Sequence, residues 1–384
     1  MENLHVEVAK SQLHKHGEEL CGDSVEVGNG PCSTIVVLSD GLGSGVKASI
    51  LSSLTARMAV TMLEGGLTLE EVVDTLAHTL PVCEKRQLAY STFTILQVFH
   101  DGNAYLAEYD NPPAFIGRGE HLRVVPRSER IMGGRVIRES FFPVGDGDWV
   151  VMVSDGVLHA GIGGVWNLGW GWDRVGSYVQ HTNKWAEAAC EIAEEIAGVT
   201  NKLYNYRPGD DATVVAVRVR RPRSLTMLVG PPVNRRDDPE VVAKLLCSPG
   251  KKVVCGGTTG NLVARELARP IRVDLRSDDR RVPPVGEIEG IDLVTEGILT
   301  LSYTLEILKS RVRPRDLVGK KDGASRLAAL LLAADYVHIM VGRAINPAHQ
   351  SPDMPLNLAL KHKIVDELAQ VLRSLGKETD VEHY

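Results

Sequence analysis

The sequence predicts an α+β sandwich followed by a smaller α/β domain, and three observations support this fold class. Several strand-like segments follow one another between about 91 and 125 without helices between them, which favours antiparallel sheets packed between helices. The valine-rich segment before Pro222 ends in Arg-Arg-Pro, and a new apolar segment starts at 225. Beyond it, the order strand, glycine loop, helix, strand is typical of a parallel, doubly wound sheet. We therefore expect domains over 1–222 and 225–384.

Side-chain periodicity predicts the individual elements. In the first domain we expect strands at Thr34–Ser39, Thr92–Phe99, Ala104–Tyr109, Leu122–Val125, Trp149–Ser154 and Thr213–Val219. The helices expected there are Val46–Leu63, Leu69–Leu80 and Trp185–Ala197. The first of them carries an apolar stripe that suits core packing, formed by Ile50, Leu51, Leu54, Met58 and Met62. In the second domain we expect strands at Leu225–Val229, Lys251–Cys255, Ile271–Leu275 and Ala334–Val341, with helices at Asn261–Leu267 and Leu358–Leu375.

The composition excludes several classes of protein. Of the 384 residues 43% are hydrophobic and 24% charged, which is the balance of a folded globular chain. The net charge of −6 predicts no nucleic-acid partner. The longest aliphatic run, Leu327–Ala334, is far shorter than the roughly 20 residues that span a bilayer. Because no signal segment is visible either, we expect a cytoplasmic location without membrane contact. The cysteines contain no Cys-x-x-Cys pair, so we expect reduced thiols.

Acidic residues stand at the ends of predicted strands. Two similar β-branched segments run into Ser-Asp-Gly, at Asp40-Gly41 and at Asp155-Gly156. Asp210 and Asp211 open a further strand, and Asp23 precedes the first one. Several carboxylates in one pocket require a counter-charge, and Mg²⁺ or Mn²⁺ prefers such oxygen ligands. A single Asp-Gly is also a common turn, but the repeated arrangement favours a metal site.

The order of these motifs resembles that of the type 2C metal-dependent protein phosphatases, in particular their bacterial SpoIIE-like branch. The matching segments, which cover about residues 4–221, are Gly22-Asp23, Asp40–Gly45, Asp110–Pro113, Val153–Gly156 and Gly209–Val215. The resemblance implies an αββα sandwich with two Mn²⁺ or Mg²⁺ ions between its sheets. It also implies in-line attack of an activated water on a phosphoserine or phosphothreonine.

The resemblance also implies roles for individual residues. Asp40, Asp155 and Asp210 would be the catalytic carboxylates, with Asp40 shared by both ions. The Gly41 carbonyl would bind one ion, and Asp23 would contact the second. If the last motif is displaced by one position, Asp211 takes the place of Asp210.

Some features near these motifs have two interpretations. His159, four residues after Asp155, is either a proton donor or, as we prefer, a helix-surface histidine. No phosphate-binding arginine of the eukaryotic branch is matched, and Lys10 and Lys15 are weak substitutes. The segment Gly161–Trp172, with five glycines and three tryptophans, is either a substrate-facing flap or a packed loop. Val46–Leu63 corresponds to the switch and dimer surface of the bacterial branch, which implies a homodimer.

A glycine loop marks the second, Rossmann-like domain. The residues Gly256, Gly257, Thr258, Thr259 and Gly260 follow a predicted strand and precede a helix. Backbone N–H groups at such a place favour an anion, so the loop is a candidate cofactor-binding or small-ligand site; a plain strand-to-helix connection is the alternative. Asp274 could then meet a ribose hydroxyl, and the segments Asp292–Gly297 and Asn346–His349 would line the same crevice.

We therefore expect a protein serine/threonine phosphatase whose second domain senses a ligand and gates activity. By family analogy, the substrate would be a phosphoprotein such as an anti-sigma-factor antagonist. The main alternative is a non-catalytic signalling module with the second domain as the ligand sensor. A two-metal phosphodiesterase is a third interpretation.

Overall fold

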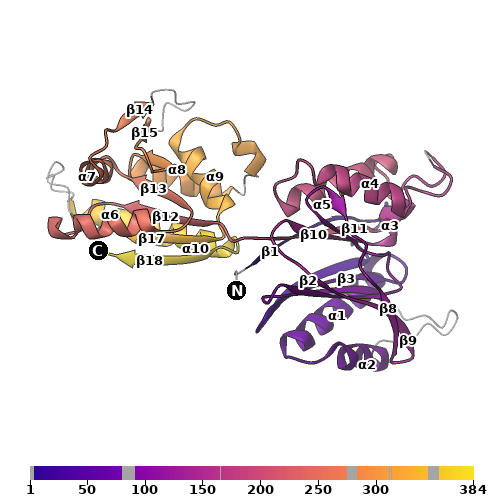
Figure 1. Ribbon diagram of the computed structural model, residues 1–384. Helices are drawn as coiled ribbons and strands as arrows, with labels where there is room; N and C mark the ends of the chain where they lie inside the picture. Colours follow the sequence, from indigo (N-terminus) through magenta and orange to yellow (C-terminus); the bar gives the residue numbers. More distant parts are fainter. Residues whose placement is uncertain are drawn as a thin grey trace. The chain divides into compact units, whose positions relative to one another are not determined.

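The computed structural model describes residues 4–79, 91–164, 166–274, 283–310, 312, 314–344 and 354–384. The chain divides into two compact units, Met1–Arg221 and Pro222–Tyr384, which are described separately below (Figure 1). Within the described ranges, no helix is long and apolar enough to cross a membrane. Cys21, Cys32, Cys190, Cys247 and Cys255 are free thiols, and Cys83 lies outside the described residues.

The first unit contains two antiparallel sheets. One has the strand order β1-β11-β10-β6-β7 and the other β2-β3-β4-β5-β9-β8. The strands are β1 His5–Leu13, β2 Asp23–Gly30, β3 Ser33–Gly41, β4 Ser91–Phe99, β5 Asn103–Tyr109, β6 Phe115–Arg118, β7 His121–Leu122, β8 Ser128–Met132, β9 Arg135–Pro143, β10 Asp148–Val153 and β11 Ala212–Arg220. The helices are α1 Gly45–Glu64, α2 Leu69–Thr79, α3 Asp155–His159, α4 Trp172–Thr182 and α5 Ala189–Leu203.

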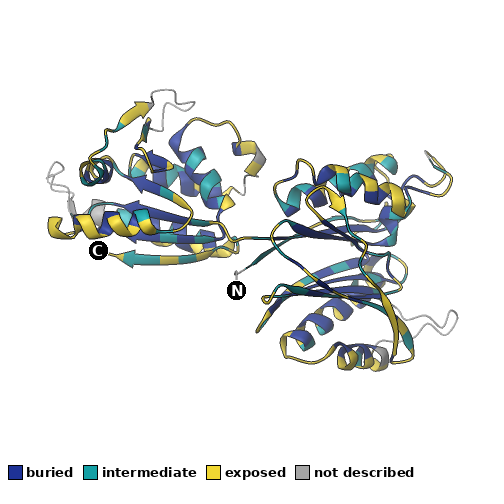
Figure 2. Ribbon diagram, in the orientation of Figure 1, coloured by how far each residue is buried: buried dark blue, intermediate teal, exposed yellow. Residues whose placement is uncertain are grey.

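Three apolar layers hold this unit together. The inner faces of the two sheets meet in a layer that includes Val36 and Leu96 from one sheet and Val150 and Val217 from the other. A second layer packs α1 and α2 on the outer face of the six-stranded sheet, and a third packs α4 and α5 on the five-stranded sheet. The strands between them are largely buried (Figure 2). The expected four-layer αββα arrangement is therefore present.

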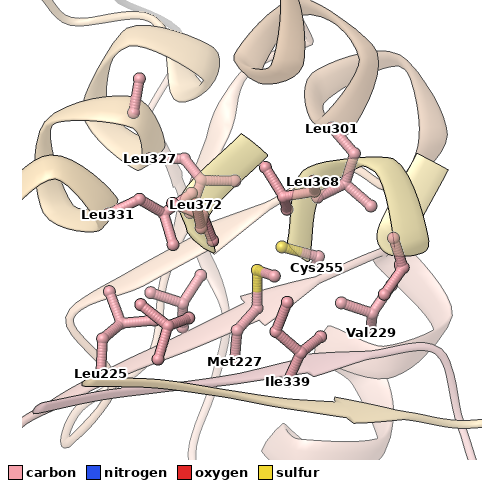
Figure 3. Close-up of a cluster of buried hydrophobic side chains, with 14 of the residues drawn as sticks. Leu225, Met227, Val229, Cys255, Leu301, Leu327, Leu331, Ile339, Leu368 and Leu372 are labelled. Carbon is pink, nitrogen blue, oxygen red and sulfur yellow. The ribbon is translucent and has the colours of Figure 1, made fainter. Parts of the chain in front are cut away.

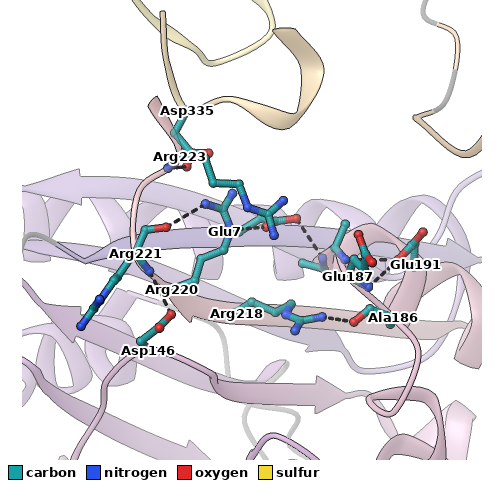
Figure 4. A network of polar contacts seen from close by, with 12 residues as sticks. Glu7, Asp146, Ala186, Glu187, Glu191, Arg218, Arg220, Arg221, Arg223 and Asp335 are labelled. Atoms are coloured by element: carbon teal, nitrogen blue, oxygen red, sulfur yellow. Dashed lines mark hydrogen bonds and ion pairs between the residues drawn. The ribbon is translucent and has the colours of Figure 1, made fainter. Parts of the chain in front are cut away.

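Polar contacts fasten the outer strand β1 to its surroundings. Glu7 on β1 accepts hydrogen bonds from the side chain of Arg220 and from the backbone of Ala189 at the start of α5. Arg218 donates to the carbonyl of Ala186, and the backbone of Arg221 donates to Asp146 (Figure 4). These contacts tie the last strand of the unit to its first strand and to α5.

Several elements differ from the sequence prediction. The expected strand Leu122–Val125 ends at Leu122, because the next residues leave the sheet and the side chain of Val124 is fully exposed. The expected helix Trp185–Ala197 is α5, which begins four residues later, where the Glu191 carboxylate accepts from the backbone of Glu187 and Ala188. The strands β1, β2, β6, β8 and β9 and the helix α4 were not predicted. Exposed residues in most of them obscure the periodicity.

The apolar stripe expected on α1 is only partly right. Leu51 is buried, but Ile50 and Leu54 are exposed. Small residues, including Ala48, Ala56 and Ala59, form much of the buried face instead. They let α1 approach the sheet closely, which leaves the larger apolar side chains on the outside.

The second unit is a seven-stranded sheet in the order β14-β15-β16-β13-β12-β17-β18. Its strands are β12 Ser224–Val229, β13 Lys251–Cys255, β14 Arg272–Asp274, β15 Val285–Glu287, β16 Leu293–Thr295, β17 Tyr336–Val341 and β18 Glu378–His383. Its helices are α6 Asp238–Cys247, α7 Gly257–Leu267, α8 Ile298–Lys309, α9 Gly323–Ala333 and α10 Met354–Ser374, with 3-10 turns η1 Arg235–Asp237 and η2 Pro314–Leu317. At the start of β12, the backbone of Arg223 donates to Asp335 (Figure 4).

Helices cover both faces of this sheet. Residues of α8, α9 and α10 pack on one face around Met227 and Ile339 (Figure 3). Residues of α6 and α7 pack on the other face around Leu228 and Met340. Side chains that alternate along β12 and β17 therefore enter opposite cores.

One strand of the second unit has a different role from the one expected. The strand that follows the glycine-loop helix, β14, pairs antiparallel with β15 at the outer edge of the sheet. The strand that lies parallel to β13 is β16. The prediction of a parallel strand at Ile271–Leu275 was therefore wrong, because a pattern of apolar residues does not encode strand direction.

Candidate metal centre

Asp23 and Asp40 lie side by side in the six-stranded sheet. β2 and β3 are antiparallel, and these two aspartates are direct partners in their register. Asp23 therefore begins β2 rather than standing in a loop before the first strand. Its side chain is 3% exposed, and neither carboxylate oxygen has a hydrogen-bond partner among the described residues. An unpartnered, buried carboxylate is costly, which indicates that a counter-charge belongs beside it.

The other sheet supplies Asp155, Asp210 and Asp211. β10 ends at Val153, and Asp155 follows it after Ser154. Asp210 and Asp211 directly precede β11, which is the antiparallel neighbour of β10. Together with Asp40 and Gly41 these residues line one cavity of about 330 Å³. The structure thus brings Asp40 of one sheet together with the predicted carboxylates of the other sheet. Asp23, the cross-strand partner of Asp40, is not among the residues that line this cavity.

The two adjacent aspartates have different surroundings. The Oδ1 atom of Asp210 accepts from the backbone N–H of Asp211, at 3.1 Å. Asp211 is buried, and its Oδ1 accepts from the backbone N–H of Lys15 at 3.0 Å. Its Oδ2 has no partner among the residues described here. This atom lies so close to Gly22 that a Cβ there would be 2.7 Å from it.

Burial and neighbouring charges raise the pKa of three of these aspartates. Burial, followed by the charges of Asp23, Asp155 and Asp210, raises the pKa of Asp40. Burial is also the main cause of the raised pKa values of Asp23 and Asp210. Bound cations would oppose these shifts, because they favour the ionised carboxylates.

The donor set fits hard divalent cations. All of the side chains concerned offer carboxylate oxygens, and three buried oxygen atoms of Asp23 and Asp211 have no other described partner. In the described part of the chain, no three acidic, histidine or cysteine side chains converge closely enough to hold an ion as they stand. An ion would therefore draw together carboxylates that otherwise repel one another.

Glycines explain why Asp-Gly recurs at this site. A Cβ on Gly41 would lie 2.2 Å from the carbonyl oxygen of Ala48 in α1. A Cβ on Gly156 would lie 2.0 Å from the carbonyl oxygen of Asp211. In both motifs, glycine thus allows a neighbouring backbone to pack against the residue that follows the aspartate.

The candidate proton donor, His159, and the two candidate phosphate-binding lysines, Lys10 and Lys15, have different surroundings. His159 is about half exposed, and its Nδ1 lies 3.8 Å from Oδ2 of Asp155. Lys15 lines the acidic cavity, and its charge lowers the pKa of Asp210 against the larger effect of burial. The Nζ of Lys10 instead donates to the carbonyl of Val25 at 3.0 Å. Of the two lysines, only Lys15 can meet a bound phosphate here.

The segment Gly161–Trp172 is anchored by its tryptophans. Trp170 is buried in the core, and Trp172 stacks on Phe115 with ring centroids 4.8 Å apart. The part that contains Gly161, Gly163 and Gly164 lines a second cavity of about 550 Å³. Asp210 lines both cavities, so this loop is well packed at one end and adjoins the acidic site at the other.

The sequence reasoning missed two groups that support the site. The hydroxyl of Tyr204 donates to the Gly156 carbonyl at 2.7 Å. Asn111 is buried, accepts from Thr92 at 2.6 Å and donates to Thr94 at 3.1 Å. The only local signal for Asn111 is its place in the Asp-Asn-Pro-Pro motif, and Tyr204 has none.

The glycine loop of the second unit is mostly helical. α7 begins at Gly257, so Gly257–Gly260 form its first turn rather than a loop before the helix. Gly256, with φ of +110°, is the residue that turns the chain, and its N–H donates to Thr295 at 2.9 Å. Thr259 is buried.

The residues expected around that loop are only partly placed there. Asp292 binds Lys251 at 2.7 Å and the backbone of Lys252 at 2.8 Å, so it lies at the amino end of β13, away from the glycines. The expectation for Asp292 was therefore wrong. Gly297, in contrast, lies beside Gly256. The side chain of Asp274 and the segment 346–349 lie outside the described residues.

A four-layer αββα sandwich with carboxylates at strand ends between its two sheets is the fold that the resemblance to the type 2C phosphatases implies. Residues 31–220, which lie in the first unit, match the family described as stage II sporulation protein E (SpoIIE). The match includes Asp40, Asp155 and Asp210 and begins after Asp23.

Individual relatives share modest identity. Stage II sporulation protein E of Bacillus subtilis (strain 168) is 26% identical over 230 residues, which are 56% of this chain and 26% of that protein. The chain thus spans about a quarter of the length of this curated relative. The solved SpoIIE phosphatase domain with a fragment of its regulatory domain, also from Bacillus subtilis, is 22% identical with a TM-score of 0.48, over 57% of this chain and 64% of that one. RsbX in complex with magnesium is 17% identical with a TM-score of 0.41, over 57% of this chain and all of that one.

Proposed function

We propose that this chain hydrolyses phosphoserine or phosphothreonine in a regulatory protein, with two Mn²⁺ or Mg²⁺ ions at the acidic cavity. The observation that supports this most directly is the meeting of Asp40, from one sheet, with Asp155 and Asp210, from the other, in one cavity. The match of residues 31–220 to the SpoIIE family agrees with this chemistry.

The proposed roles follow from where each residue lies. Asp40 is the cross-strand partner of Asp23 and lines one cavity with Asp155 and Asp210, so it is the carboxylate that two ions would share. Asp155 and Asp210 would hold the first ion and Asp23 would contact the second, with the Gly41 carbonyl as a further ligand. When bound, the ions supply the Lewis acidity that activates a water molecule and stabilises charge on the phosphoryl oxygens. Asp211 supports the site by holding the backbone of Lys15.

The remaining groups orient the substrate. Lys15 can attract the phosphoryl group, since it is the cation that lines the acidic cavity. The second cavity adjoins Asp210 and is lined by glycines and by Ile162, so it offers space for the peptide around the phosphorylated residue. His159 is a surface residue beside Asp155 in this proposal.

Phosphate release from a phosphoserine peptide tests the proposal. We expect turnover with Mn²⁺, none with chelator, and a loss of at least about 100-fold in Asp155→Asn, because a lost metal ligand removes charge stabilisation. Asp366→Asn, at an exposed position on α10, is the matched control and should turn over like the wild type. A folded Asp155→Asn variant with wild-type activity would contradict the two-metal assignment.

The wider setting of the activity is also part of the proposal. The substrate is a phosphoprotein such as an anti-sigma-factor antagonist, and the second, Rossmann-like unit gates activity in response to a small ligand at Gly256–Gly260. Its five parallel strands have the order of doubly wound, ligand-binding folds, which supports such a role.

The exposed Val46, Ile50 and Leu54 on α1 support a homodimer. Ultracentrifugation tests it, and a monomer mass independent of concentration would exclude it.

A further inference from the structure

The parallel part of the second sheet has a point where its connections change sides. Its strand order is β16-β13-β12-β17-β18. The chain first adds β13 and then β16 on one side of β12, and later adds β17 and then β18 on the other side. The first connections, with α6 and α7, cover one face, and α8, α9 and α10 cover the other. Ligands of open parallel sheets bind beyond the carboxyl ends of the strands at such a point, which here lies between β12 and β17.

The chain beyond these two strands is built from closely approaching glycines. Gly342 donates to the carbonyl of Val229 at 2.9 Å, and Ala344 donates to that of Pro231 at 3.1 Å. A Cβ on Gly342 would lie 2.1 Å from the Pro231 carbonyl oxygen, and Gly230 has φ of +84°. The two segments therefore stay paired for two residues past the strands. Gly230 and Gly342 shape them, and a residue with a side chain would not fit at either position without strain.

A lysine from α10 reaches this pair of segments. The Nζ of Lys361 donates to the carbonyl of Gly342 and lies beside Gly230, where a Cβ would be 2.7 Å from it. Lys361 is partly buried, and burial lowers the pKa of its ammonium group. Within the described ranges no carboxylate pairs with this ammonium group, although it can donate three hydrogen bonds.

Other basic side chains gather at the same edge. The rings of His362 and His383 lie 5.3 Å apart, between their centroids. Burial lowers the pKa of His362, and the charges of Lys361, His383 and Arg343 lower it further. Asp366 is the acidic neighbour that opposes this effect. Among the residues that the structure describes, this basic cluster has little counter-charge, in a chain whose net charge is −6.

We propose that the second unit binds the phosphate group of a small molecule at the carboxyl ends of β12 and β17, with Lys361 as its principal contact and Arg343, His362 and His383 around it. This basic site is distinct from the glycine turn at the start of α7 and from the metal centre. A phosphate dianion accepts several charge-assisted hydrogen bonds at once and supplies a counter-charge that the described residues around the cluster do not provide. The other interpretation is that Lys361 only fastens the Gly342 carbonyl.

Binding of inorganic phosphate to the full chain distinguishes the two interpretations. The titration is done by calorimetry in chelator and at constant ionic strength, so that phosphate does not bind through metal ions in the first unit. We expect Lys361→Met to weaken binding about tenfold or more, because a charge-assisted contact is lost. Lys363→Met, at an exposed position on the same helix, should bind within about twofold of the wild type. Equal affinity of Lys361→Met and the wild type would overturn the proposal.

A second measurement needs no change at Lys361. Phosphate should shift the ring resonances of His362 and His383 in the selectively labelled wild-type chain, as assigned with His362→Gln and His383→Gln. Shifts no larger than those caused by chloride at the same ionic strength would overturn the proposal. Parallel titrations with adenosine monophosphate and glycerol 3-phosphate identify the source of the phosphate group, which is the probe that binds most tightly.

Discussion

Asp23 and Asp40 are direct cross-strand partners, and the Asp23 carboxylate is buried without a hydrogen-bond partner among the described residues. Two like charges at opposed positions of an antiparallel pair destabilise a sheet. Here the cost falls on the strand ends that form the acidic cavity. This arrangement fits a cation site, because bound cations would offset the repulsion between the two carboxylates.

Asp40→Asn should stabilise the metal-free protein and abolish its stabilisation by metal. In chelator the raised pKa of Asp40 costs stability, because the unfolded chain ionises this carboxyl more readily than the folded chain does. Asparagine removes this cost, so we expect an increase of about 1–2 kcal/mol, or a few degrees in Tm. Mn²⁺ should raise the Tm of the wild type and leave that of the variant almost unchanged. Thermal unfolding with and without Mn²⁺ measures both effects. Asp74→Asn, at an exposed position on α2, is the control, and equal stabilisation of Asp40→Asn and the wild type by Mn²⁺ would contradict the assignment.

Gly41→Ala should destabilise the first unit and distort the metal site. The new methyl group would lie 2.2 Å from the Ala48 carbonyl, so α1 has to move, and we expect a loss of about 3 kcal/mol in urea unfolding together with weaker Mn²⁺ binding. Gly198→Ala is the matched change in α5, where a methyl group meets nothing within 4 Å. It should raise stability by roughly 0.5–1 kcal/mol, because alanine favours a helix. The glycine argument fails if both variants behave alike.

Tyr204→Phe should reduce activity through the position of the Asp155 motif. The lost hydrogen bond to the Gly156 carbonyl is worth about 1 kcal/mol, and the motif that it holds includes Asp155. Burial, with the charges of Asp210 and Asp155, raises the pKa of Tyr204, so its hydroxyl remains a donor across the accessible pH range. We expect kcat to fall several-fold with little change in KM. Tyr206→Phe, at an exposed neighbouring position, should leave both constants unchanged.

Lys361 should make the stability of the second unit depend on pH. Its pKa is lowered in the folded chain, whereas in the unfolded chain it is about 10.4. Its contribution to stability is therefore fully present above about pH 10.4 and is lost as the pH falls through the lower, folded value. Urea unfolding in phosphate-free buffer between neutral and alkaline pH should show the wild type gaining stability relative to Lys361→Met as the pH rises. The corresponding difference for Lys363→Met should stay flat, and a flat difference for Lys361→Met would contradict the buried ammonium.

Much of the first unit could be predicted because its signals are local. The strands around Val36 and Val151 are continuous apolar segments that end in Asp-Gly, and such a segment shows both the strand and the place of the acidic residue. The αββα arrangement followed from the order of the motifs through the family resemblance. In contrast, β8 and the start of α5 depend on pairing and capping partners that a short window does not contain.

In the second unit, local sequence patterns led to two wrong predictions. Gly256–Gly260 was expected to be a loop, but only Gly256 turns the chain, because helix propensity is weak against the packing of α7 on the sheet. The strand β14 was expected to be parallel, although its direction is set by its pairing with β15. The meeting of Lys361 with Gly342 leaves no trace in the sequence around either residue.

By itself, the sequence determined which acidic residues stand at strand ends, because strand periodicity and the glycine that follows each aspartate are properties of adjacent residues. It also determined where one folded segment gives way to the next, at Pro222. Only the tertiary structure decided that Asp23 opposes Asp40, that Asp155 and Asp210 reach the same cavity from another sheet, and that Lys361 meets the ends of β12 and β17. These relationships depend on register and strand order, which arise from contacts between residues far apart in the chain.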